Sequence, residues 1–135
     1  MDRKRTVFEY NSMCADLKGG ILSKKVDTEE LTRTLCGIGK DGWELDRTLF
    51  TQDGGTTVSA VIISRREKGT VKKFEYSVTG IVLEGPIARK QVNISEFDNT
   101  LNNMAEEGWE LGETIYTQAF GATSTMVAIF KRELI

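Results

Sequence analysis

Apolar and polar side chains alternate in two segments of the chain, "WELDRTLF" at 43–50 and "WELGETIY" at 109–116. This period of two predicts β-strands with one covered face. The residues on that face are Trp43, Leu45, Leu49, Trp109, Leu111 and Ile115. We expect the face to pack against a helix, which assigns both tryptophans, Leu45 and Leu111 to the structural core.

A helical pattern precedes each of these strands. In the first, Asp27 and Glu30 have the spacing of a capping box, and Leu31, Leu35 and Ile38 recur at helical spacing. The same positions in the second helix hold Asn93, Glu96, Phe97, Leu101 and Met104. A glycine at the end of each pattern, Gly42 or Gly108, predicts a left-handed helix-closing residue.

The last strand of each half, "TVSAVIISRRE" at 57–67 and "TSTMVAIFKRE" at 123–133, is apolar on both faces. Such a strand is expected in the centre of a sheet or at an interface. The opening strands begin with the same letters, "FEY", at 8–10 and 74–76. Each half therefore runs strand, strand, helix, strand, strand, an order typical of antiparallel α+β folds.

The two halves align at an offset of 66 residues without a gap. Of the 60 aligned pairs between 8–67 and 74–133, 24 are identical. This similarity predicts a tandem duplication, with a first unit at 1–67 and a second at 68–135. Because units of roughly 60 residues bury too little surface alone, we expect one compact pseudo-dimeric domain. The predicted fold is an antiparallel sheet of six to eight strands with two helices on one face, built from two pseudo-twofold-related ββαββ units.

Composition narrows the class of function. The 135 residues carry a net charge of −2 and are 39% hydrophobic and 28% charged, which favours a globular protein with little attraction for nucleic acid. Neither a membrane span nor a secretory signal is evident, so we expect no membrane partner and a cytoplasmic location, in a bacterium or a phage-infected host.

Candidate chemistry is sparse. The chain has no histidine, and its two cysteines, Cys14 and Cys36, lack metal-binding spacing. No glycine-rich loop leads into a helix as a phosphate-binding loop does. We therefore expect no catalytic residue, no cofactor and no metal, and predict that the protein is not an enzyme.

The motifs "FEY" and "GWEL", each present twice, and "IFKR" at 129–132 resemble those of short bacterial and phage domains of unknown function. The first half departs from the pattern at its end, where "IISRR" stands in place of "AIFKR". The resemblance implies a fold and carries over no catalytic residue.

Four carboxylates occupy equivalent strand positions in the two halves: Glu9, Glu44, Glu75 and Glu110. An acid/base role would require a shifted pKa in a cleft. The simpler interpretation, which we favour, is that these carboxylates pair across strands with Arg66 and Arg132.

The alternation also places an aromatic and basic surface away from the helices. Its residues are Phe50, Tyr116, Phe130, Arg66 and Arg132. Arginine forks and aromatic rings suit a small anionic, nucleotide-like ligand held near the seam between repeats or subunits. Because both residue types are also enriched at protein interfaces, the alternative is an assembly module that forms homo-oligomers through its sheet face or edge.

Overall fold

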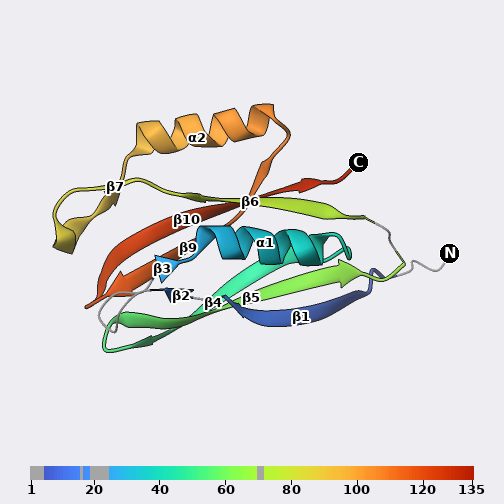
Figure 1. Ribbon diagram of the computed structural model, residues 1–135, viewed down its shortest axis with the longest axis horizontal. Coiled ribbons are helices and arrows are strands. Elements are labelled where there is room, and N and C mark those ends of the chain that lie inside the picture. The colour runs from blue at the N-terminus through green and yellow to red at the C-terminus, as the bar shows by residue number, and fades with distance from the viewer. Residues whose placement is uncertain (1–4, 16, 19–24, 70–71) are drawn as a thin grey trace.

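The computed structural model describes residues 5–15, 17–18, 25–69 and 72–135. Two three-stranded antiparallel sheets form its framework (Figure 1). The first has the order β1 (Phe8–Ala15), β5 (Thr56–Glu67), β4 (Glu44–Asp53), and the second has the order β6 (Phe74–Gly80), β10 (Ala122–Glu133), β9 (Glu110–Ala119). The two apolar strands, β5 and β10, are therefore central, as predicted.

Two helices and four short strands complete the described structure. The helices are α1 (Thr28–Gly39) and α2 (Ile94–Glu106), and the short two-stranded ladders pair β2 (Leu17–Lys18) with β3 (Lys25–Val26) and β7 (Leu83–Glu84) with β8 (Gln91–Val92). A 3-10 turn, η1 (Ile87–Arg89), lies between β7 and β8. Both helices begin as predicted, because the side chains of Asp27 and Asn93 accept the backbone N–H of the residue three positions later.

The helices also end near the predicted glycines. Gly42 and Gly108 have φ angles of 91° and 88°, in the left-handed region that favours glycine. The α+β class is therefore confirmed. The single sheet of six to eight strands is not observed, because the edge strands β4 and β9 contact each other without forming a continuous ladder.

A β-bulge interrupts the predicted alternation in both β4 and β9. The strand register skips Asp46 in β4 and Gly112 in β9. One extra residue turns every later side chain to the opposite face, so the residues on either side of the bulge do not share an environment. Leu45 is buried whereas Leu49, beyond the bulge, is exposed.

The second half shows the reverse distribution. Ile115 is buried whereas Leu111 is 43% exposed, so the assignment of Leu111 to the core is wrong. The alternation predicted that Phe130 lies on a surface away from the helices. Phe130 is instead 1% exposed, within the central strand β10.

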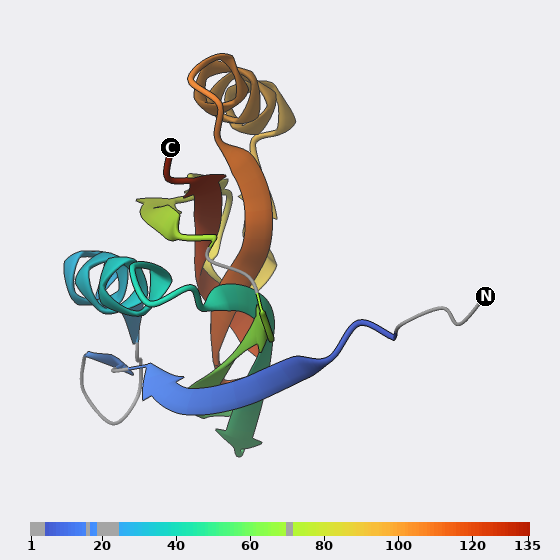
Figure 2. The same cartoon turned by 90° about the vertical axis from the view of Figure 1, so that its right-hand side faces the viewer.

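One hydrophobic core joins the two halves. Its buried members are Val26, Leu31, Leu35, Leu45, Ile62, Tyr76, Ile115, Val127 and Ile129. Helix α1 belongs to the first half but packs against β6 of the second. Helix α2 contributes no buried residue and stands apart from α1 (Figures 1 and 2). The predicted placement of both helices on one face of a single sheet is therefore not confirmed.

Tyr76 connects α1, β4 and β6. Its hydroxyl accepts the backbone N–H of Leu45 at 2.8 Å and donates to the carbonyl oxygen of Trp43 at 3.1 Å. The Cys36 thiol of α1 donates to the Tyr76 carbonyl and accepts the Tyr76 N–H. Burial raises the pKa of the Tyr76 hydroxyl to about 12.

Candidate binding cleft between the two sheets

Arg66 is held by three groups at the end of β5. Its Nε donates to Glu9 Oε1 at 2.6 Å, and its Nη1 donates to the Asp41 carbonyl at 2.9 Å. The guanidinium carbon lies 4.4 Å from the centre of the Trp43 ring, in cation–π geometry. Most of the binding capacity of this side chain is thus used within the fold.

Arg132 repeats this arrangement in the second half. It donates to Glu75 Oε1 at 2.5 Å and to the Glu107 carbonyl at 2.6 Å, and it lies 4.1 Å from the Trp109 ring centre. The predicted pairing of strand carboxylates with Arg66 and Arg132 is confirmed for Glu9 and Glu75. The two tryptophans are half-buried beneath these guanidinium groups instead of lying fully in the core.

The aromatic residues of the predicted site are divided. Phe50 and Tyr116, which are equivalent positions of the two halves, meet with ring centres 5.5 Å apart. Next to them, Gln52 Nε2 donates to Gln118 Oε1 at 2.5 Å, again between equivalent positions. Phe130 does not join them because it is buried. The structure therefore brings Phe50 and Tyr116 together at the seam and leaves Arg66 and Arg132 in separate clusters.

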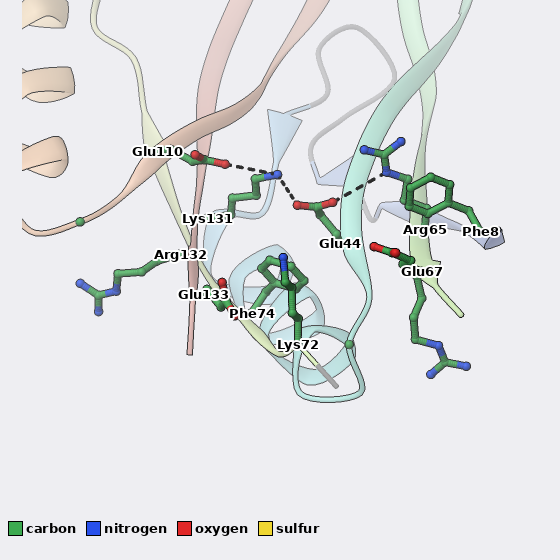
Figure 3. Close-up of a pocket in the computed structure, with 13 residues that line it drawn as sticks. Phe8, Glu44, Arg65, Glu67, Lys72, Phe74, Glu110, Lys131, Arg132 and Glu133 are labelled. Atoms are coloured by element: carbon green, nitrogen blue, oxygen red, sulfur yellow. Dashed lines mark hydrogen bonds and ion pairs between the residues drawn. The ribbon is translucent and has the colours of Figure 1, made fainter. Parts of the chain in front are cut away.

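A cleft of about 270 Å³ opens between the ends of the two sheets (Figure 3). Its lining includes both arginine clusters and a second set of charges: Glu44, Arg65, Glu67, Lys72, Glu110, Lys131 and Glu133. Phe8 and Phe74 supply its aromatic lining. The cleft lies between the C-terminal ends of the equivalent strands β5 and β10. It does not include Phe50 or Tyr116.

Lys131 forms the centre of the charge network in this cleft. Its Nζ lies 2.6 Å from Glu44 Oε2 and 3.4 Å from Glu110 Oε1, so it joins equivalent carboxylates of the two halves. Its side chain is largely buried. One cation thus offsets the mutual repulsion of Glu44 and Glu110 across the seam.

Arg65 is the cation with unused hydrogen-bonding capacity. Its guanidinium lies 4.4 Å from the Phe8 ring centre, and its contacts with Glu44 and Asp46, at 3.7 and 3.8 Å, are too long for hydrogen bonds. Its buried Nε has no hydrogen-bond partner in the described part of the chain. Figure 3 shows the guanidinium at the side of the cleft, with Phe8 beside it.

Sequence reasoning selected the second basic residue of "RR" and "KR" and missed the first. All four side chains line the cleft, but Arg66 and Arg132 bond Glu9 and Glu75, whereas Arg65 and Lys131 lie on the opposite faces of their strands. Two basic residues in succession on a strand must lie on opposite faces. The sequence therefore already indicated that only one residue of each basic pair lies on a given face of the strand.

Within 5–15, 17–18, 25–69 and 72–135, no three carboxylate or cysteine side chains gather as metal ligands would. In the same part of the chain, no helix has the length and apolar character needed to cross a membrane.

The comparisons with known proteins concern the second half. Residues 74–133 match the model of a family described as a domain of unknown function (DUF4177). This match begins with β6 and ends with β10. No curated protein and no solved structure matches the chain. The resemblance to domains of unknown function is therefore confirmed for the second half, and it assigns no activity.

Proposed function

We propose that this chain is a non-enzymatic binding protein that holds a small anionic ligand in the cleft between its two sheets. The observation that carries this proposal is Arg65, whose guanidinium lines the cleft with its Nε buried and without a hydrogen-bond partner among the described residues. A phosphate or carboxylate in the cleft could accept the terminal N–H groups of this guanidinium, with the planar geometry that arginine favours.

The surroundings of Arg65 favour a ligand with a flat, charged end. Phe8 lies next to the guanidinium and also lines the cleft, so an aromatic ring of a ligand has a stacking surface near the anion site. Lys72, also in the lining, makes no ion pair within the described chain. The volume of about 270 Å³ lies just below the roughly 300–1,000 Å³ of sites for drug-sized ligands, which favours a nucleotide-like group or smaller.

Carboxylates in the same lining set a limit on affinity. Glu44 and Glu110 are offset by Lys131, but Glu133 lines the cleft without an ion pair in the described structure. A negative charge at Glu133 opposes an anionic ligand. Its removal is therefore expected to strengthen binding.

Calorimetry with inorganic phosphate and with linear and cyclic nucleotides tests this proposal. Arg65→Ala should weaken binding at least tenfold, and Glu133→Gln should strengthen it severalfold. Arg47→Ala is the matched control, because Arg47 is a largely exposed arginine of β4 outside the cleft lining. If no compound binds with a Kd below about 100 μM, roughly −5.5 kcal/mol, the proposal is wrong.

We also propose that residues 1–67 and 68–135 are two copies of one unit. The supporting observations are the same strand order in both sheets, bulges at Asp46 and Gly112, and the two arginine clusters. Each of these features recurs 66 residues later.

The alternative function, an assembly module that forms homo-oligomers, is favoured by a different observation. Large apolar side chains are exposed on strands, on α2 and in the connections between elements; they include Val7, Tyr10, Leu49, Val82, Ile94, Leu111 and Phe120. Where such residues form a continuous surface, that surface is typical of one that another chain covers.

A further inference from the structure

Helix α1 packs against β6, but the two equivalent elements of the chain do not pack against each other. Helix α2 and strand β1 are the elements at the equivalent positions, 66 residues away from α1 and β6 respectively. Figure 2 shows them at opposite ends of the structure, with α2 at the top and β1 at the bottom. Within one chain, therefore, the contact made by α1 and β6 is not made by α2 and β1.

Side-chain exposure differs at four matched positions of this contact. Tyr76 of β6 is 3% exposed, whereas Tyr10 of β1 is 59% exposed. Leu45, which the Tyr76 side chain covers, is 5% exposed, whereas its counterpart Leu111 is 43% exposed. On the helices, Leu31 and Leu35 are buried, whereas their counterparts Phe97 and Leu101 are only half-buried.

Helix α2 is also loosely packed within the chain. A cleft of about 250 Å³ separates its N-terminal turns from β6, and Phe97 and Thr100 line it. The helix is as well capped as α1, and its apolar residues have the same spacing. An amphipathic helix of this kind is stabilised mainly by packing of its apolar face, and this chain supplies little of that packing.

We infer that α2 of one copy packs against the outer edge of β1 of a second copy, in the manner of α1 on β6. The internal contact identifies the occupant, because the two exposed surfaces are counterparts of the two that fit together within the chain. In the assembly Tyr10 would be buried beside Leu111 of the other copy, with its hydroxyl near the Leu111 N–H and the Trp109 carbonyl. These are the counterparts of the groups that bind the Tyr76 hydroxyl.

One residue opposes a close copy of the internal contact. A Cβ atom at Gly39 would overlap the Phe74 carbonyl oxygen, so α1 approaches β6 at a point where only glycine fits. The counterpart of Gly39 in α2 is Ala105, whose methyl group would meet the Phe8 carbonyl of the second copy. The contact between copies must therefore be slightly wider, and it is expected to be weaker than the internal contact.

This inference does not depend on the ligand proposal. Because each copy has one α2 surface and one β1 surface, two copies can satisfy both surfaces in a closed dimer, or many copies can form an open chain. Pairing of β1 with β1 through their backbone edges is the competing mode of association.

Sedimentation velocity of the full chain, over a range of concentrations, tests the inference with two substitutions. Leu101→Asp on α2 and Tyr10→Asp on β1 should each weaken association at least tenfold. An equimolar mixture of the two variants should recover heterodimers, because each retains the surface that the other has lost. Leu49→Asp, at an equally exposed leucine of β4 outside the contact, is the matched control and should associate like the unmodified protein.

A third variant keeps the test decisive if an aspartate disturbs folding. Ala105→Gly should tighten association severalfold, because it removes the methyl group that keeps the helix from the strand. Association that survives Leu101→Asp but not Tyr10→Asp would replace the inference with β1–β1 pairing. A chain that stays monomeric at high micromolar concentration, or an Ala105→Gly variant that associates no better, would overturn it.

Discussion

Helices α1 and α2 have similar local sequences and different environments. Both begin with a side-chain cap, at Asp27 and Asn93, and both are followed by a glycine with positive φ. Helix α1 buries Leu31, whereas α2 buries none of its residues. The comparison shows that capping and periodicity determine where a helix forms, while its contribution to the core depends on which surface is within its reach.

Two substitutions explain part of the difference in packing. Gly39 allows α1 to lie directly on the backbone of β6, and Cys36 supplies a thiol that bonds both the N–H and the carbonyl of Tyr76. The counterparts in α2 are Ala105 and Asn102, which are both exposed. Helix α1 therefore packs closely on β6, whereas the apolar face of α2 is not buried within the chain.

The largest expected difference in stability is between two variants that each truncate one leucine, on α1 or on α2. Leu35→Ala should destabilise the chain by about 2–5 kcal/mol, because Leu35 is fully buried in the shared core. Leu101→Ala should cost less than about 1 kcal/mol in dilute solution, because its side chain is already partly solvated. Urea denaturation measures both values. Similar losses for the two variants would contradict the proposed difference between the helices.

Removal of one hydroxyl group from each strand sharpens the comparison. Tyr76→Phe should cost about 1–3 kcal/mol, because the buried Leu45 N–H and Trp43 carbonyl lose their partner. Tyr10→Phe should leave the stability of the dilute chain unchanged, since Tyr10 is exposed. Thermal unfolding of the two variants measures both effects. A Tyr76→Phe variant as stable as the unmodified chain would show that the hydroxyl does not hold β4 to β6.

Alkaline pH tests the same contact when the unmodified chain is compared with Tyr76→Phe, in which the other titrating groups are the same. Burial raises the pKa of Tyr76 to about 12, whereas an unfolded tyrosine titrates near 10. The stabilising effect is fully present below about pH 10 and is lost as pH rises towards about 12, because only the unfolded state releases this proton readily. The loss should reach about 1.4 kcal/mol near pH 11. Tyr76→Phe should lack this component, so equal pH dependence in the two proteins would contradict the account.

The smallest expected effect distinguishes the two helix caps. A hydrogen bond from the Lys18 ammonium, together with the Glu30 N–H, holds the pKa of Asp27 below its ordinary value. A lowered pKa stabilises the fold above the unfolded value and loses that effect as pH falls below about 4. The cap of α2 is the neutral Asn93 and has no such dependence. Thermal melts of Asp27→Asn should therefore differ from those of the unmodified chain near neutral pH and converge with them in acid.

Local features of the fold were predictable from the sequence, and pairings between distant segments were not. The caps at Asp27 and Asn93 and the central position of β5 and β10 follow from spacing and hydrophobic pattern. The packing of α1 on the opposite half has no local signature. The bulges at Asp46 and Gly112 had no signal in the alternation. Leu45 and Leu111 both precede their bulges, and only Leu45 is buried, beside Tyr76.

The candidate site was predicted in part. Phe50 and Tyr116, equivalent residues of the two halves, do meet, but outside the cleft. Arg66 and Arg132 line the cleft, but their cation–π contacts with the tryptophans were not foreseen, and the neighbouring Arg65 and Lys131 were missed. Arg65 became a candidate only when the structure showed its buried Nε without a hydrogen-bond partner among the described residues.

Hydrogen exchange measured at increasing protein concentration tests the central claim most directly. The claim is that α1 and β6 are satisfied within one chain, whereas α2 and β1 require a second copy. We predict that amide protection in α1 and β6 stays constant, and that protection in α2 and β1 rises together as the concentration increases. Protection of α2 that is already equal to that of α1 in dilute solution, or that never changes with concentration, would contradict the claim.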